Sequence, residues 1–242
     1  MRAIWLIFRK ELGQYFNSPL AYIIAAAFLL LTGIAFNNDL ALSLTRKPVD
    51  PNLIPDLLSG TLILFAPLLT MRLLAEENRE GTMELLLTAP VSDMSIVIGK
   101  FLSAWFYYSF LLMLTLSYQF ILIQVTFPDI AHTIAAYLGI WLYGGATLAV
   151  GLMFSATTEN QILAAFLSTI TLMILYFAES IGNIVANIDL ATIIFNLTLP
   201  GHYVPSFAVG IVRAEDIVYY AGIIVVMLFI SIRLVASRRW QA

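Results

Sequence analysis

Long apolar stretches alternate with short polar segments along most of this chain. They cover residues 20–36, 57–75, 96–124, 133–154, 161–180 and 217–235. Each stretch reaches or nearly reaches the about 20 residues that an α-helix needs to cross about 30 Å of hydrocarbon. The pattern therefore predicts an all-α polytopic membrane protein with six transmembrane helices. These spans and their short connections form one membrane domain over residues 1–242.

The composition excludes a water-soluble domain. Of 242 residues, 61% are hydrophobic and 11% are charged, and the mean hydropathy is +0.91. In soluble domains about a quarter of the residues are charged, so this chain has too few polar groups to cover the surface of a water-soluble fold. The sequence contains no cysteine, which excludes disulfides, thiolate-bound zinc and iron–sulfur clusters.

The distribution of Lys and Arg predicts the orientation. Six spans place both termini on one side of the membrane, together with the connections at 72–100 and 155–160. That side carries Arg2, Arg9, Lys10, Arg72, Arg79, Lys100, Arg233, Arg238 and Arg239, whereas the other carries Arg46, Lys47 and Arg213. The side richer in cations is cytoplasmic by the positive-inside rule. Both termini are therefore expected in the cytoplasm.

The first 18 residues have the pattern of an interfacial helix. At 100° per residue one face collects Ile4, Trp5, Phe8, Leu12, Tyr15 and Phe16, and the opposite face collects Arg2, Arg9, Lys10, Gln14 and Asn17. Leu6, Ile7 and Glu11 blur this division. We expect the helix to lie on the cytoplasmic surface with its cations against anionic membrane lipid. The alternative is a simple positively charged flank.

The stretch 181–212 is too apolar for a solvated loop, yet glycines and prolines interrupt it. These are Gly182, Pro200, Gly201, Pro205 and Gly210. Backbone at membrane depth must find its hydrogen bonds inside protein or beside a cavity. The pattern favours an extracytoplasmic re-entrant segment of two half-helices between the fifth and sixth spans. A seventh span is the alternative, but it would place the C-terminal arginines outside.

The polar connection at 76–92 predicts a structured elbow. Gly81 can end the incoming helix in a left-handed conformation, and Thr82 can cap a short helix that a proline then ends. Ser92 or Asp93 can cap the next span. The elbow's expected surface is acidic, at Glu76, Glu77, Glu80 and Glu84. An acidic rim next to leucines suits the docking of a soluble partner, and a solvated loop that touches lipid is the alternative.

The elbow sequence EENREGTMELLLTAPVS, followed by Gly99-Lys100-Phe101, resembles the cytoplasmic coupling segment of type-2 ABC exporter permeases. The opening Arg9-Lys10-Glu11-Leu12 and the residues over 15–22 are similar to the GldF branch, which is linked to gliding motility and polysaccharide, and NosY permeases have a related layout. The resemblance covers essentially the whole chain. It implies a permease in a bacterial inner membrane.

The resemblance further implies a half-transporter. Two permease chains, identical or different, would pair, and each would rest on a separate ABC ATPase that binds ATP and magnesium. A companion subunit with a large extracytoplasmic domain is possible in this branch. The complex would export an amphipathic or polymeric substrate, or do work on surface or motility machinery. The implied ATPase-coupling residues are Glu76, Glu77, Arg79, Glu80, Gly81, Thr82, Glu84 and Pro90.

The residues give no sign that the chain is an enzyme, binds a cofactor or binds nucleic acid. Gly99-Lys100 is not part of a phosphate-binding loop, because Phe101 follows and the earlier glycine is missing. His132 and His202 fall in expected outward loops without further ligands, so they are interpreted as polar surface. Glu179, near the outer end of the fifth span, would contact the re-entrant segment or line an exit path.

Two other classes of function remain open. A secondary transporter or channel would have titratable groups deep in its spans and an internal repeat, and only Glu179 approaches that description. A membrane scaffold without transport activity would need no coupling segment.

Overall fold

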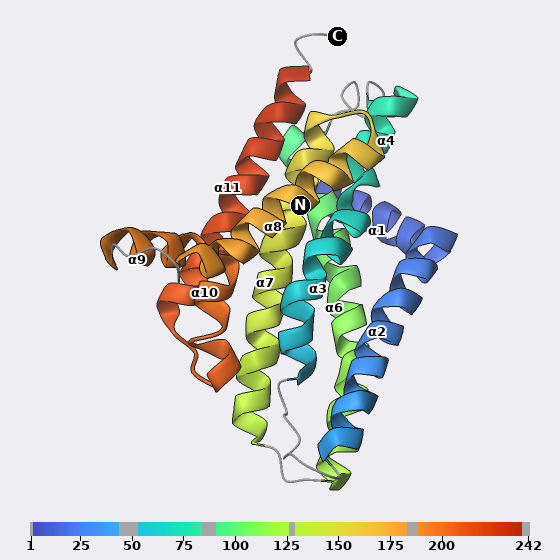
Figure 1. The fold of residues 1–242 in the computed structure, drawn as a ribbon. Coiled ribbons are helices and arrows are strands. Elements are labelled where there is room, and N and C mark those ends of the chain that lie inside the picture. The colour runs from blue at the N-terminus through green and yellow to red at the C-terminus, as the bar shows by residue number, and fades with distance from the viewer. Residues whose placement is uncertain (1, 44–52, 84–90, 126–128, 183–187, 239–242) are drawn as a thin grey trace.

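The computed structural model describes residues 2–43, 53–83, 91–125, 129–182 and 188–238, and these parts are helical without a strand (Figure 1). The long helices are α2 (Pro19–Ser43), α3 (Leu53–Thr70), α6 (Asp93–Val125), α7 (Ile130–Thr157), α8 (Gln161–Gly182) and α11 (Ala214–Arg238). The shorter ones are α1 (Arg2–Asn17), α4 (Arg72–Glu80), α9 (Ile188–Leu197), α10 (Leu199–Tyr203) and the 3₁₀ turn η1 (Phe207–Val209).

Six helical stretches within the described residues are long and apolar enough to cross a membrane, as predicted. The helices extend beyond the purely apolar residues, since their polar end turns are also helical. Ser92 begins α6 as expected, because its hydroxyl accepts a hydrogen bond from the Ser95 N–H at 3.3 Å.

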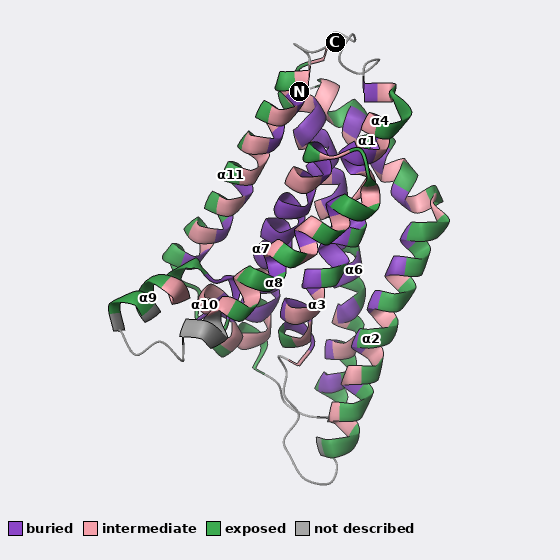
Figure 2. Ribbon diagram, turned by 45° about the horizontal axis from the view of Figure 1, so that its top comes forward, coloured by how far each residue is buried: buried purple, intermediate pink, exposed green. Residues whose placement is uncertain are grey.

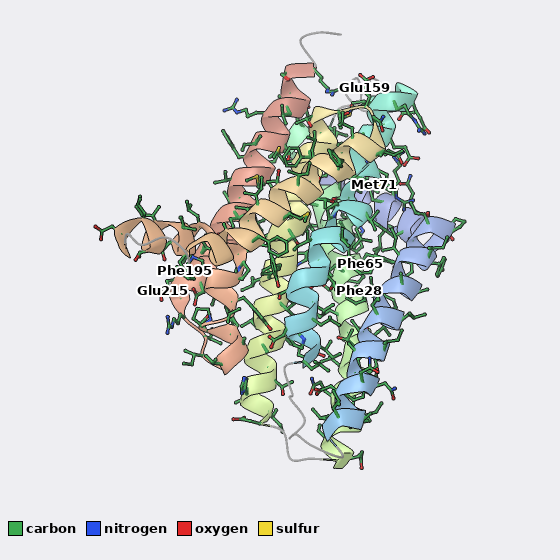
Figure 3. The ribbon with its side chains drawn as sticks, in the orientation of Figure 1. Phe28, Phe65, Met71, Glu159, Phe195 and Glu215 are labelled. Carbon is green, nitrogen blue, oxygen red and sulfur yellow. The ribbon has the colours of Figure 1, made fainter. Side chains whose placement is uncertain are left out.

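Helix α7 lies at the centre of the bundle (Figure 2). Its apolar stretch is 78% buried, whereas those of α8 and α11 are each 17% buried. Close packing depends on small residues: a Cβ on Gly144 would clash with the Tyr108 ring. The Tyr108 hydroxyl donates to the Ile140 carbonyl at 2.8 Å, which satisfies this polar group inside the core. Helices α2 and α3 meet through Phe28 and Phe65, whose rings pack edge to face (Figure 3).

The second predicted span, 57–75, lies within one helical stretch, Leu53–Glu80, whose hydrogen-bond ladder is interrupted between α3 and α4. Met71 lies at this interruption, which we call the α3–α4 turn, and keeps helical backbone angles (φ −53°, ψ −34°) (Figure 3). A side chain from α7 supplies the missing hydrogen bonds. The Ser155 hydroxyl accepts from the N–H groups of Leu74 and Ala75, both at 3.0 Å, and donates to the Met71 carbonyl at 2.9 Å. The break is invisible in the hydrophobic pattern because both sides of it are apolar.

The stretch between the last two spans is divided into short helices. Helix α9 has ten residues and α10 has five, and both are shorter than a membrane crossing. Gly210 adopts a left-handed φ of 80° after η1. The alternative of a seventh span is therefore wrong for the described residues 188–212. Helix α9 projects sideways from the bundle (Figure 1), and its depth in a membrane stays a prediction.

Helix α1 is present, but its buried face differs from the predicted one. The buried residues are Ile7, Glu11 and Tyr15, one turn apart, whereas the predicted apolar residue Trp5 is 61% exposed. In the sequence, Ile7 and Glu11 blurred the predicted division into faces, and a carboxylate is costly to bury alone. Its ion pair with α6 changes that balance and turns the helix toward Glu11. An interfacial position of α1 stays a prediction.

Candidate functional site

A cluster of four charged side chains joins α1, α4 and α6 on the side predicted to be cytoplasmic. We call Lys10, Glu11, Glu77 and Lys100 the charged junction. The Lys100 Nζ lies 2.9 Å from a Glu11 carboxylate oxygen and 2.8 Å from one of Glu77, and the Lys100 side chain is only 1% exposed. The Lys10 Nζ lies 3.6 Å from both carboxylates at the exposed edge. Two cations and two anions therefore balance, with Glu11, Glu77 and Lys100 buried and Lys10 at the exposed edge.

The position of Glu77 corrects the sequence interpretation of the elbow. Glu77 was expected on an acidic outer surface, but it is buried and faces α1 and α6. Its second carboxylate oxygen is buried without a hydrogen-bond partner. Burial of an ionised carboxylate is tolerated only with a close counter-charge, and Lys100 provides it. Glu77 therefore pairs with Lys100 between the helices and is not part of an exposed acidic surface.

Helix α1 approaches α6 closely enough for this contact because of Gly99. A Cβ at that position would lie 2.8 Å from the Ile7 side chain and 3.1 Å from the Ile4 carbonyl oxygen. Only a glycine permits such an approach without displacement of α1. The adjacent Lys100 is thereby brought within reach of Glu11, so the Gly99-Lys100 pair is a packing and pairing motif.

A second contact joins the start of α2 to α4. The Arg72 guanidinium donates to the Ser18 hydroxyl at 2.7 Å and lies 5.2 Å from the centre of the Tyr15 ring. The Tyr15 hydroxyl donates to the Leu69 carbonyl at 2.6 Å. Burial raises the pKa of Tyr15 far above its ordinary value, so this phenol stays neutral and keeps its donor role. Arg72 and Tyr15 thus fix the α1–α2 corner against the α3–α4 turn.

A polar groove of about 460 Å³ opens beside the charged junction, between α1 and α4. Gln14, Glu76, Glu80 and Thr82 are among the residues that line it. The groove is therefore the accessible face of the charged junction, and α4 contributes carboxylates to its wall.

Some of the remaining predicted coupling residues lie in the part of the chain that the structure describes, and others do not. Gly81 ends α4 with a left-handed φ of 70°, as its predicted role requires. Arg79 and Glu80 are exposed, and a guanidinium nitrogen of Arg79 lies 3.9 Å from a carboxylate oxygen of Glu80. The Thr82 hydroxyl donates to the Glu77 carbonyl at 3.4 Å. Glu84 and Pro90 lie outside the described residues, as does the side chain of Glu179. The coupling role of these residues stays a prediction.

The two histidines differ from their predicted setting, since both lie in helices. His132 is in the first turn of α7 and bonds the Ala208 carbonyl at 2.8 Å. His202 is in α10, and its Nδ1 lies 2.7 Å from an Asp216 carboxylate oxygen. Each histidine therefore joins the 188–212 stretch to a long helix. Among the described residues, no three His, Asp or Glu side chains gather as metal ligands do.

Sequence reasoning missed Glu11, Lys100 and Ser155. One signal for Lys100 was available: it lies inside the predicted span 96–124, and a charge within a span is normally paired. Its partners could not be named, because Glu11 is 89 residues away in the chain. Ser155 had no signal, since it was placed in the connection 155–160, where a serine is common.

Comparison with known proteins agrees with this architecture. The sequence profile of the family described as ABC-2 family transporter protein matches residues 52–236, which include the α4 side of the junction and five of the six spans. A comparison with curated proteins gives no significant match. The match covers well over half of the chain, and it implies an ABC ATPase as partner. The chain therefore belongs to the ABC-2 family of transporter proteins, as a multi-pass membrane permease subunit of an ABC transporter.

Proposed function

We propose that this permease is an exporter subunit in which the charged junction transmits movement from a partner ATPase to the membrane spans. The observation that carries the proposal is the burial of Lys100 between Glu11 and Glu77. Helix α4 contains the first residues of the elbow at 76–92, and its charged contact with α1 and α6 makes independent movement costly. A force on the elbow would move the three helices together.

The Ser155 contact extends this connection to the centre of the bundle. Through it the α3–α4 turn is bound to α7, the most buried of the six spanning stretches. A buried serine with three backbone partners resists sliding of one helix past the other, because each lost hydrogen bond leaves an unpaired group. The route from elbow to core therefore runs through α4 and Ser155.

The exposed part of α4 is proposed as the docking surface for the ATPase. Arg79 and Glu80 are exposed, and Glu76 and Glu80 border the polar groove. Exposed charges govern partner choice and association rate, whereas buried pairs govern rigidity. Docking and transmission are thus assigned to different residues of the same short helix.

The complex is proposed to contain two permease chains, as the resemblance to type-2 ABC exporter permeases implies. Its cargo is proposed to be amphipathic or polymeric, and work on surface or motility machinery belongs to the same proposal. We place the assembly in a bacterial inner membrane with both termini cytoplasmic, where nine of the chain's twelve Lys and Arg residues would then lie.

Affinity purification of the assembled complex tests the docking surface. Glu76→Ala combined with Glu80→Ala is expected to reduce recovery of the ATPase at least about tenfold, with a normal yield of folded permease. Glu215→Ala is the matched control, since Glu215 is an exposed carboxylate far from α4 (Figure 3). Undiminished ATPase recovery with the double variant would overturn the docking role.

A secondary transporter or a static scaffold predicts a different result. In those cases a variant of the partner ATPase that cannot hydrolyse ATP would leave the cellular phenotype unchanged. The exporter proposal predicts that this variant and deletion of the permease give the same phenotype.

A further inference from the structure

Three of the four tryptophans in the chain gather around one apolar groove. Trp5 of α1, Trp105 of α6 and Trp141 of α7 line a hollow of about 450 Å³, together with Ile4, Phe8 and Phe106. The fourth, Trp240, lies outside the described residues. The groove is on the outer surface of the bundle, since Trp5 and Phe106 are more than half exposed. A groove with such walls accepts hydrocarbon.

The groove continues along the bundle toward the opposite side of the membrane. A second apolar hollow of about 430 Å³ shares Ser109 and Trp141 with the first and reaches Leu116 on α6 and Thr133 on α7. From Leu102 to Leu116 the α6 helix rises about 21 Å, which exceeds half of a hydrocarbon core of about 30 Å. The two hollows together have the length for an extended acyl chain.

The indole N–H groups are already used inside the protein. The Trp105 Nε1 donates to the Trp141 carbonyl at 3.3 Å, and the Trp141 Nε1 donates to the Ser109 hydroxyl at 2.8 Å. The two rings stack with centroids 4.5 Å apart, and a Cβ at Gly145 would lie 2.9 Å from Trp105. The Trp105 and Trp141 rings are therefore held rigidly and present their apolar faces to the groove, with both of their indole donors engaged inside the protein.

Two arginines of α1 flank Trp5, one of the residues that line the groove. Arg2 lies three residues before Trp5 and Arg9 four residues after it, so both are its neighbours at the edge between the apolar and the polar face of the helix. Both arginines are exposed. Guanidinium groups bind phosphate oxygens with bidentate hydrogen bonds. Tryptophan, the residue between the two arginines, is typical of the membrane interface. The α1 edge of the groove thus combines anion recognition with an apolar slot.

From this combination we infer that the groove is a binding site for an anionic phospholipid, with its phosphate between Arg2 and Arg9 and an acyl chain along Trp105 and Trp141. A second copy of this chain is a poorer occupant, because it would have to bring an anion to the arginines and a chain-like apolar segment to the slot at once. The site is separate from the charged junction and does not depend on the proposed export function.

Tryptophan fluorescence of the full chain in lipid vesicles tests the site directly. In a Trp240→Phe background, the remaining tryptophans all line the groove. Phosphatidylglycerol with brominated acyl chains should quench them with about tenfold higher apparent affinity than brominated phosphatidylcholine. The combined Arg2→Gln and Arg9→Gln variant should remove that preference, whereas Arg213→Gln on the opposite side should keep it.

Two results would overturn the inference. Equal quenching by both brominated lipids would show an unselective lipid-facing surface. Weak quenching by both would show that protein, such as a second copy of the chain, covers the groove. Circular dichroism of each variant confirms that the helical content is unchanged, so loss of preference cannot be assigned to unfolding.

Discussion

The two ends of the bundle are held together by different chemistry. On the predicted cytoplasmic side, charged side chains of α1, α4 and α6 meet in a buried cluster around Lys100. On the opposite side, α3, α10 and α11 are joined by tyrosine hydroxyls and by one contact between His202 and Asp216. Tyr203 donates to an Asp56 carboxylate oxygen at 3.1 Å, and Tyr220 donates to the Leu199 carbonyl at 2.8 Å.

The difference determines how each end responds to a lost contact. Removal of one charge from a buried cluster leaves its partner without compensation, which is costly and affects all three helices at once. Removal of one tyrosine hydroxyl costs about one hydrogen bond and leaves the aromatic packing intact. The charged end is therefore suited to move as one body, and the tyrosine end is suited to rearrange in small steps.

The largest effect is expected from Lys100→Met, which leaves Glu11 and Glu77 buried without their close counter-charge. We expect a loss of about 3–5 kcal/mol in the free energy of unfolding, measured by denaturant unfolding of the purified chain. Addition of Glu11→Gln and Glu77→Gln should restore most of this loss. If the triple variant were no more stable than Lys100→Met alone, the charges would not be what holds the junction.

Ser155→Ala should give the next largest effect, because it removes the hydroxyl that hydrogen-bonds three backbone groups at the α3–α4 turn. The expected loss is about 2 kcal/mol in the same unfolding measurement. Ser168→Ala is the matched control: that serine is equally buried, but it bonds only the Ala164 carbonyl of its own helix. Equal losses for both variants would contradict the role of Ser155 in joining two helices.

At the opposite end, Tyr203→Phe should cost about 1 kcal/mol, since it removes one hydrogen bond and keeps the ring. The melting temperature of the purified chain is the measurement. A loss as large as that of Lys100→Met would show that the two ends do not differ in the way described above.

The smallest effect on stability is expected from Glu80→Gln. This carboxylate is 52% exposed and lies 3.9 Å from Arg79, so its loss should change the free energy of unfolding by less than about 0.5 kcal/mol. The same variant should reduce ATPase recovery. Strong destabilisation would show that Glu80 has a structural role like that of Glu77.

The sequence predicted the number of spans and the turn at Gly81, because both depend on local patterns. Long apolar runs need no information from elsewhere in the chain, and a glycine between two helical segments indicates a left-handed turn. The hydrophobic pattern also located the interruption that follows α8, although it could not give the bounds of α9 and α10.

The charged junction could not be predicted, because its members come from distant parts of the chain. Glu77 and Glu80 are both carboxylates of the same short helix, three residues apart, yet one is buried and the other is exposed. The packing of α4 against α1 and α6 decides which of them meets Lys100, and the sequence near α4 does not show that packing. Likewise, the break at Met71 became apparent only when Ser155 of α7 was placed beside it.

The central claim is that the Glu77–Lys100 contact carries ATP-driven movement from α4 to the far ends of the spans. Because the chain has no cysteine, spin labels can be attached at Asn38→Cys on α2 and Ile130→Cys on α7, both exposed at the opposite end. Their separation is measured by pulsed electron paramagnetic resonance in the complex with its ATPase, with and without ATP.

The account predicts an ATP-dependent change in this distance for the otherwise unmodified permease. With Glu77→Gln the ATPase should still bind and hydrolyse ATP, but the distance change should be lost. An undiminished change in the Glu77→Gln complex would contradict the claim.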